Sequence, residues 1–304
     1  MSAMSVRIGY GLGTAGGPPD GDRLRAVAQA LERHGFDSLW LSERIGGDVV
    51  DPVVGLAYAA AVTSRLKLGF SVMVLPGRNP ALVAKQLASL DRLAAGRLLP
   101  AFGLGAPNPR EHQAFAVDAA DRGAWLEESM PLLRRFWHEG AVDHDGEHFQ
   151  FRDVEVRPKP LGRMEMWLGG AGPRQLERVG RLADGWLGSF TTPDEAGEAR
   201  VAVEAAAAQH ERAVDPGHFG VLLPYAHGPL DGALLARGRR GRPPVPVEDI
   251  AAQGLAEVAP LVERFVARGV TKFVLVPVAE PEDWDAELGG LAEAVAPLQG
   301  APAA

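Results

Sequence analysis

The sequence predicts an α/β protein folded as a (β/α)8 TIM barrel. Short apolar strands alternate with amphipathic helices, which is the pattern of a parallel sheet with helical crossovers. Strand starts near residues 6, 37, 66 and 98 recur at the spacing of one strand plus one helix. Eight strands can be proposed within the 304 residues, which is the barrel number. A doubly wound open sheet is the alternative, and it is weakened because no G-x-G-x-x-G motif opens a helix after the first strand.

The first half of the chain gives the clearest elements. Strands are expected at residues 6–13, 38–42, 66–75 and 97–105. Asp22 is expected to cap the helix after the first strand, and the Asn79-Pro80 pair to begin the helix after the third. Gly35 and Gly96 are expected to end these helices, because glycine readily adopts the conformation found there.

The second half is less regular. A long helix is expected around Trp125 and Phe136, followed by a small hairpin within 141–160 around Asp145-Gly146. Four more strands are expected at residues 164–170, 185–189, 218–225 and 271–277. Residues 226–249, rich in glycine, proline and arginine, are expected to form a mobile loop over one end of a single domain spanning 1–304.

Composition limits the function classes. A formal net charge of −8 argues against nucleic acid as a partner, because phosphate binding needs a basic face. The chain has no cysteine, which excludes disulfides, thiolate nucleophiles and cysteine-bound zinc. The first ten residues have no apolar signal core and no stretch approaches the length of a membrane span. We expect a soluble cytoplasmic protein.

In such a barrel the chemistry lies at the C-terminal ends of the strands. The most informative of these ends is Gly169-Gly170-Ala171-Gly172-Pro173-Arg174, where a glycine-rich turn opens a helix. Free N–H groups at a helix N-terminus bind anions, and Arg174 can add a positive charge. A tight turn that needs glycine for positive φ explains the same residues equally well.

Other strand ends carry less specific signals. Glu43-Arg44 is either an ion pair at the barrel rim or a functional pair, and the hydroxyl of Tyr225 can face a ligand. His112 and His227 lie in loops. The sequence contains no H-E-x-x-H or G-x-S-x-G motif and no metal constellation, so a bound cofactor is the expected source of chemistry.

Residues 226–249, called the insertion from here on, carry a basic patch. Its arginines are Arg237, Arg239, Arg240 and Arg242. They indicate either a solvated loop, which is the favoured interpretation, or capture of an anionic ligand tail.

These residues support a resemblance to a known family. The stretches G-F-D-S-L-W-L-S-E (35–43), T-S-R-L-K-L-G-F-S-V-M-V-L-P-G-R-N-P (63–80), L-D-R-L-A-A-G-R-L (90–98) and M-W-L-G-G-A-G-P-R-Q-L-E-R-V-G-R-L-A-D-G-W-L (166–187) span most of residues 5 to 190. Together they resemble the luciferase-like monooxygenase superfamily, and most closely its coenzyme F420-dependent oxidoreductase branch.

The resemblance implies a barrel of the bacterial-luciferase type with an insertion between late strands. It implies a non-prolyl cis peptide at Ser71-Val72, in a bulge that supports the isoalloxazine ring. It places Glu43, Arg44, Leu104 and Gly105 beside the ring. It also implies that the backbone N–H groups of Gly169, Gly170, Ala171 and Gly172 hold the cofactor's phosphate.

The chain also departs from the family pattern. Many F420 enzymes carry Asp-His where this chain has Glu43-Arg44, and some carry a glutamate where it has Ala106. The sugar-phosphate-oxidising branch relies on both groups, so we do not expect that reaction here. The remaining candidates are Arg44 as an electrostatic stabiliser and Tyr225, His112 or His227 as proton donors.

The expected function is therefore an F420-dependent oxidoreductase that transfers hydride between the deazaflavin and a small organic substrate. One alternative keeps the fold and uses reduced FMN and oxygen, with a flavin reductase as partner. Another is a non-catalytic flavin or F420 carrier. A basic groove of Arg78, Arg110, Arg174 and the insertion arginines would favour F420, whose oligoglutamate tail FMN lacks. The resemblance also implies a homodimer.

Overall fold

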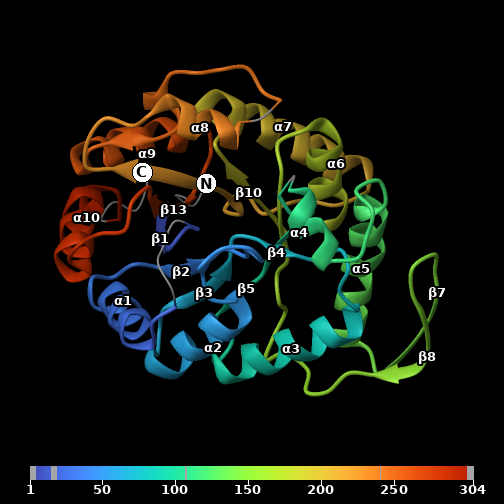
Figure 1. The fold of residues 1–304 in the computed structure, drawn as a ribbon. Coiled ribbons are helices and arrows are strands. Elements are labelled where there is room, and N and C mark those ends of the chain that lie inside the picture. Colours follow the sequence, from blue (N-terminus) through green and yellow to red (C-terminus); the bar gives the residue numbers. More distant parts are fainter. Residues whose placement is uncertain (1–4, 15–18, 107, 240, 300–304) are drawn as a thin grey trace.

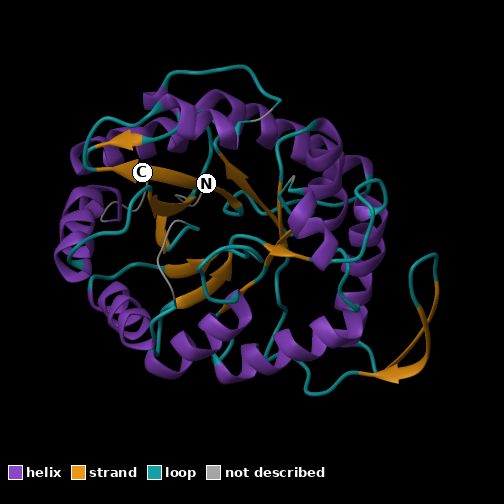
Figure 2. Ribbon diagram, viewed as in Figure 1, coloured by secondary structure: helices purple, strands orange, loops and turns teal. Residues whose placement is uncertain are grey.

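A computed structural model describes residues 5–14, 19–106, 108–239 and 241–299. Its strands stand at the centre of a ring of helices (Figures 1 and 2). The barrel strands are β1 (Arg7–Gly11), β2 (Ser38–Leu41), β3 (Lys67–Phe70), β4 (Met73–Val74), β5 (Leu98–Leu99), β6 (Ala101–Gly103), β9 (Trp167–Gly169), β10 (Gly185–Ser189), β11 (Phe219–Ala226) and β13 (Lys272–Pro277).

These segments form eight barrel positions, because the third and fourth strands are each split in two. The hydrogen-bonded order is β4-β6-β9-β10-β11-β13-β1-β2-β3-β5, and every neighbouring pair is parallel. Since β3 pairs with β5 and β4 pairs with β6, both halves of the third strand meet the fourth. The predicted (β/α)8 architecture is confirmed, and a short strand, β12 (Ala252–Gln253), extends the sheet beside β11.

Most helices surround the barrel on its outside, whereas the short helix α4 (Pro109–Ala114) lies inward of this ring in Figure 1. The helices are α1 (Gly21–Arg33), α2 (Pro52–Val62), α3 (Pro80–Leu93), α4, α5 (Arg122–His138), α6 (Pro173–Leu182), α7 (Pro193–Gln209), α8 (Gly232–Gly238), α9 (Val258–Val266) and α10 (Trp284–Gln299), with 3-10 turns η1 (Val247–Asp249) and η2 (Leu255–Glu257). Within the described ranges, no helix combines the length and apolar character needed to cross a bilayer.

The observed N-cap of α3 agrees with the prediction from the sequence, whereas that of α1 differs from it. Asn79 caps α3 as predicted, since its Oδ1 accepts from the N–H groups of Ala81 and Leu82. The cap of α1 is Asp20 and the prediction of Asp22 was wrong. Asp20 has an extended backbone and its Oδ1 accepts from the N–H of Asp22, which already lies inside the helix.

Two excursions leave the barrel. The predicted hairpin is confirmed as β7 (Ala141–Asp145) and β8 (Gln150–Glu155), which pair antiparallel and stand away from the barrel in Figure 1. The stretch 226–249, expected to be a loop throughout, contains α8 and η1. Helix formation there starts at Asp231, whose Oδ1 accepts from the N–H of Ala233.

Strand alternation divides the core into two layers. On β11 the side chains of Phe219, Val221, Leu223 and Tyr225 belong to the large apolar cluster shared with the helices, whereas Leu222 packs on the smaller inner cluster. The inner cluster fills the barrel with Trp40, Ala101, Trp167, Leu187 and Val274. Because these side chains fill the interior, a ligand site can form at the end of the barrel where the carboxyl ends of the strands lie.

Candidate active site

A cavity of about 300 Å³ opens at the carboxyl ends of β4, β6, β9 and β10. Six residues predicted to bind the cofactor line it: Ser71, Val72, Leu104, Gly105, Gly169 and Gly170. The sequence therefore placed residues from three separate strand ends in one cavity. The opposite wall comes from Leu187, Ser189 and Leu222, and the outer side from Leu126, Gln175 and Arg178.

The wall from the third strand is formed by Ser71 and Val72. The peptide bond between them is cis, as the resemblance implies. Val72 packs closely against the next strand, because a Cβ placed on Gly103 would lie 2.6 Å from Val72 Cγ2. Ser42 fixes the same segment from β2, since its hydroxyl donates to the carbonyl of Ser71 at 2.9 Å. The valine side chain is thereby held as a fixed part of the cavity wall.

The glycine-rich turn after β9 presents converging donors. The N–H groups of Ala171 and Gly172 both donate to Oε1 of Gln175, each at 2.9 Å. Gly170 has φ +132°, and a Cβ there would lie 2.6 Å from the Cβ of Gln175. A neutral amide oxygen thus occupies the point where two backbone N–H groups at the start of α6 meet. An anionic oxygen fits the same donors once the Gln175 side chain turns away.

Gln175 is a functional candidate that the sequence interpretation missed. The available signal was its position three residues after Gly172, the N-cap of α6, where a glutamine commonly folds back onto the cap. Arg178, one turn further along α6, was also missed. Its guanidinium is paired with Glu127 of α5 at 2.8 Å, which holds α6 against α5 behind the cavity.

Glu43 and Arg44 do not pair with each other and lie outside the cavity lining. The Glu43 carboxylate is only 4% exposed, accepts from the N–H of Val74 at 2.7 Å and pairs with Arg78. Burial raises the pKa of Glu43 although Val74 and Arg78 act in the opposite direction. Arg44 instead lies 3.4 Å from Glu111 of α4. Glu43 therefore braces the segment that follows Val72, a positioning role.

The expectation that Tyr225 faces a ligand was wrong. Its side chain is 1% exposed, and its hydroxyl bonds the hydroxyl of Tyr10 at 2.8 Å and Oε1 of Glu287 at 2.7 Å. Burial raises the pKa of Tyr225, with Tyr10 and Glu287 adding to the effect. Strand alternation places Tyr225 on the helix side of β11, the same side as Phe219. His227 bonds the other oxygen of Glu287 at 2.7 Å.

His112 is the one proton-donor candidate of the three that adjoins the cavity. Its Nε2 lies 2.7 Å from the carbonyl oxygen of Ala106, and Ala106 lines the cavity. In the described residues, no group of three histidine, aspartate or glutamate side chains is arranged to hold a metal ion.

The expected basic groove is not assembled as the sequence suggested. Arg78 is engaged by Glu43, while Arg110 and Arg174 are exposed and lie outside the cavity lining. Arg239 is 3% exposed and paired with Glu195, so the interpretation as a solvated loop was wrong for this residue. Arg240 and the side chain of Arg237 lie outside the described residues.

A second cavity, of about 230 Å³, lies on the other side of β2. It is bounded by α1 and α2 and by the ends of β1, β2 and β13, with an apolar lining that includes Leu24, Val54 and Trp284. Ser42 lines this second cavity and donates to Ser71, which lines the first. Hydrogen bonds between Ser42 and Ser71 therefore link the walls of the two cavities.

Known proteins with similar sequences include F420-dependent enzymes. The chain is 31% identical over 175 residues to an F420-dependent glucose-6-phosphate dehydrogenase of Kineococcus radiotolerans, covering 54% of this chain and 51% of that protein. The chain thus spans about half the length of the curated relative.

Solved structures share the fold along nearly the whole chain. An F420-dependent secondary alcohol dehydrogenase in complex with an F420-acetone adduct superimposes with a TM-score of 0.82 at 19% identity, over 97% of this chain and 99% of that one. The oxygenating constituent of 3,6-diketocamphane monooxygenase from Pseudomonas putida, in complex with FMN, gives 0.77 at 17% identity, over 97% and 99%. The model of the luciferase-like monooxygenase family matches residues 3–237, and the chain belongs to that family.

Proposed function

We propose that this protein is an F420-dependent oxidoreductase that transfers hydride between the deazaflavin and a small organic substrate. One observation carries the proposal: a single cavity is lined by Ser71-Val72, by Gly169-Gly170 and by Gln175, whose Oε1 accepts from the two N–H groups that follow Gly170. Curated relatives matched over about half their length carry the name F420-dependent glucose-6-phosphate dehydrogenase, which favours F420 as the cofactor.

The residues at the cavity fit a ring joined to a phosphate. Val72, Leu104 and Gly105 would contact the ring, and the N–H groups of Ala171 and Gly172 would hold a phosphate oxygen in place of Gln175. When bound, the deazaflavin supplies or accepts the hydride. The chain's own contribution is to fix the ring face against the substrate and to keep water out of the cavity.

The substrate we propose is not a sugar phosphate. Arg44 and Ala106 occupy the positions at which the sugar-phosphate-oxidising branch carries its histidine and glutamate. Arg44 is paired with Glu111 and Ala106 has no titratable group. His112, bonded to the Ala106 carbonyl, is the side chain best placed to move a proton at this rim.

A binding titration of the purified chain tests the cofactor. Binding of F420 and, separately, of FMN is monitored by the fluorescence of each cofactor. We expect F420 to bind tightly and FMN weakly. Tight FMN binding with weak F420 binding would overturn the proposal. It would support the alternative, a monooxygenase that uses reduced FMN delivered by a flavin reductase. Tight F420 binding would support a non-catalytic carrier instead if no alcohol tested reduces F420 and reduced F420 reduces no carbonyl or alkene tested.

Two further properties belong to the same proposal. Barrel helices are the surface through which we propose a homodimer forms, and sedimentation of the purified chain tests it. We also propose that the protein is cytoplasmic, and fractionation of cells that express the chain tests this location.

A further inference from the structure

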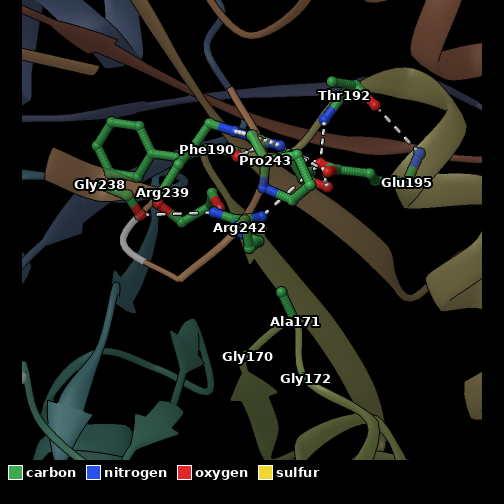
Figure 3. Close-up of polar contacts among 12 residues, drawn as sticks. Gly170, Ala171, Gly172, Phe190, Thr192, Glu195, Gly238, Arg239, Arg242 and Pro243 are labelled. Atoms are coloured by element: carbon green, nitrogen blue, oxygen red, sulfur yellow. Dashed lines mark hydrogen bonds and ion pairs between the residues drawn. The ribbon is translucent and has the colours of Figure 1, made fainter. Parts of the chain in front are cut away.

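The insertion is fixed to the barrel rim by a buried ion pair. Arg239 is 3% exposed and donates from Nη1 and Nη2 to the two oxygens of Glu195, at 2.8 and 2.7 Å (Figure 3). It also donates to the carbonyl of Phe190 at 2.7 Å. Gly238 lies against the Phe190 ring, since a Cβ there would be 2.5 Å from Phe190 Cδ2. Gly238 and Arg239 of the insertion are thereby held against the end of β10.

Arg242 comes three residues later and is only partly satisfied. Its Nη2 donates to the carbonyl of Ser189 at 3.0 Å. Its Nη1 is buried and has no hydrogen-bond partner among the described residues, and the Oε2 of Glu195 lies 3.8 Å away. A buried guanidinium N–H without a partner is costly and rare in native proteins. The arrangement therefore points to a partner that the chain itself does not supply.

The register of the sheet locates this unpaired donor. Strands β9 and β10 run parallel with Leu187 opposite Gly169, the last residue of β9, so Ser189 and the glycine-rich turn after Gly169 lie at the same edge of the sheet. Neighbouring strands lie about 4.8 Å apart. Arg242, bonded to the carbonyl of Ser189, therefore lies next to a residue of the cavity wall, and in the view of Figure 3 it is drawn between Pro243 and Ala171.

The local charge balance also favours an anion. Two guanidinium groups, those of Arg239 and Arg242, share the single carboxylate of Glu195. Arg239 takes both carboxylate oxygens as hydrogen-bond acceptors and Arg242 forms only a longer ion pair with one of them, so the three side chains together carry one net positive charge.

We propose that Arg242 binds the phosphodiester of the cofactor tail, completing from the insertion the anion site that the glycine-rich turn begins. This inference rests on the proposed F420 function and deepens it. An oxygen of the phosphodiester would accept from Nη1 of Arg242, while the N–H groups of Ala171 and Gly172 hold the group from the other side. The guanidinium of Arg242 would bind an oxyanion. Two groups of the tail supply one: the phosphodiester, and the carboxylates of the glutamates further along.

The test compares Arg242→Gln and Arg242→Lys with a matched control, Arg152→Gln. The side chain of Arg152 is 64% exposed, lies on β8 of the hairpin and is not part of the cavity lining. Each protein is titrated by fluorescence with three probes: F420 with its glutamates, the phospholactyl form without glutamates, and the deazaflavin riboside without phosphate. We expect Arg242→Gln to weaken both phosphate-bearing probes by roughly 10- to 100-fold, the effect of one hydrogen bond to a charged group. Arg242→Lys should weaken them less, and the riboside should bind all variants alike.

The outcomes separate this inference from the function it rests on. Tight binding of F420 to the wild type with unchanged binding to Arg242→Gln would overturn the role of Arg242 alone. A loss confined to the glutamate-bearing probe would overturn the phosphodiester assignment in favour of the carboxylates. Failure of the wild type to bind any of the probes would overturn the proposed function itself. Retained riboside binding shows that each variant is folded.

Discussion

The substitution Gly170→Ala tests whether the glycine-rich turn must keep its conformation to bind phosphate. Gly170 has φ +132°, a region that residues with a Cβ rarely adopt, and such backbone strain costs on the order of 1–3 kcal/mol. The new methyl group would also lie 2.6 Å from the Cβ and 2.9 Å from the Oε1 of Gln175. Relief of both problems requires the turn or Gln175 to move, and the N–H groups of Ala171 and Gly172 move with it.

The expected consequence is a weaker complex. Because each 1.4 kcal/mol corresponds to a factor of about ten, strain of this size predicts a roughly 10- to 100-fold higher Kd for F420. The assay is the fluorescence titration, with urea unfolding measured in parallel.

A matched control separates strain from binding. Gly35 also has positive φ (+79°), and a Cβ there meets no described atom within 4 Å. Gly35→Ala should cost about 1–2 kcal/mol of stability and leave the Kd unchanged. Unchanged F420 affinity in Gly170→Ala, or an equal loss in both variants, would refute the assignment of the turn.

Three other expectations concern the groups around the site. Tyr225→Phe should lower stability by about 1–3 kcal/mol, since it leaves buried partners unpaired, and should not change F420 affinity; urea unfolding and the titration measure both. Glu43→Gln should destabilise by about 3–5 kcal/mol because Arg78 loses a buried partner, and an equally stable variant would contradict the bracing role. Hydrogen bonds from Arg239, opposed by burial, lower the pKa of Glu195 to about 2 from 4.5. The attachment of the insertion should then be complete above pH 4.5 and weaken progressively as the pH falls from 4.5 through about 2, as cleavage by an acid protease can show.

The parts of the fold set by local patterns could be predicted from the sequence. Asn79-Pro80 specifies a helix start by its own side chain and ring, and Asp145-Gly146 lies in the loop of the hairpin between β7 and β8. Helix α2 was missed because its sequence, P-V-V-G-L-A-Y-A-A-A-V, is apolar on all sides and shows no helical period. The Asp20 cap was missed because two aspartates stand near the same helix start.

The candidate site was predictable where it depends on strand ends and not where it depends on contacts between distant elements. Ser71, Leu104 and Gly169 end strands and therefore meet at one rim. Tyr225 also ends a strand, but its side chain faces the helices, which counting residues from Phe219 would have shown. The burial of Arg239 could not be read from a basic, glycine-rich stretch, because its partner Glu195 belongs to another helix.

The double use of Glu195 has a consequence for how this rim moves. Its carboxylate accepts from the N–H of Thr192 at the start of α7 and also holds Arg239 of the insertion. Unwinding the first turn of α7 therefore releases the insertion, and release of the insertion exposes the start of α7. Opening events of this kind occur in cooperative units, each with its own free energy. We expect the first turn of α7 and the described residues Gly238, Arg239, Gly241 and Arg242 to open as one such unit, so their amide hydrogens should exchange at a common rate set by a single opening.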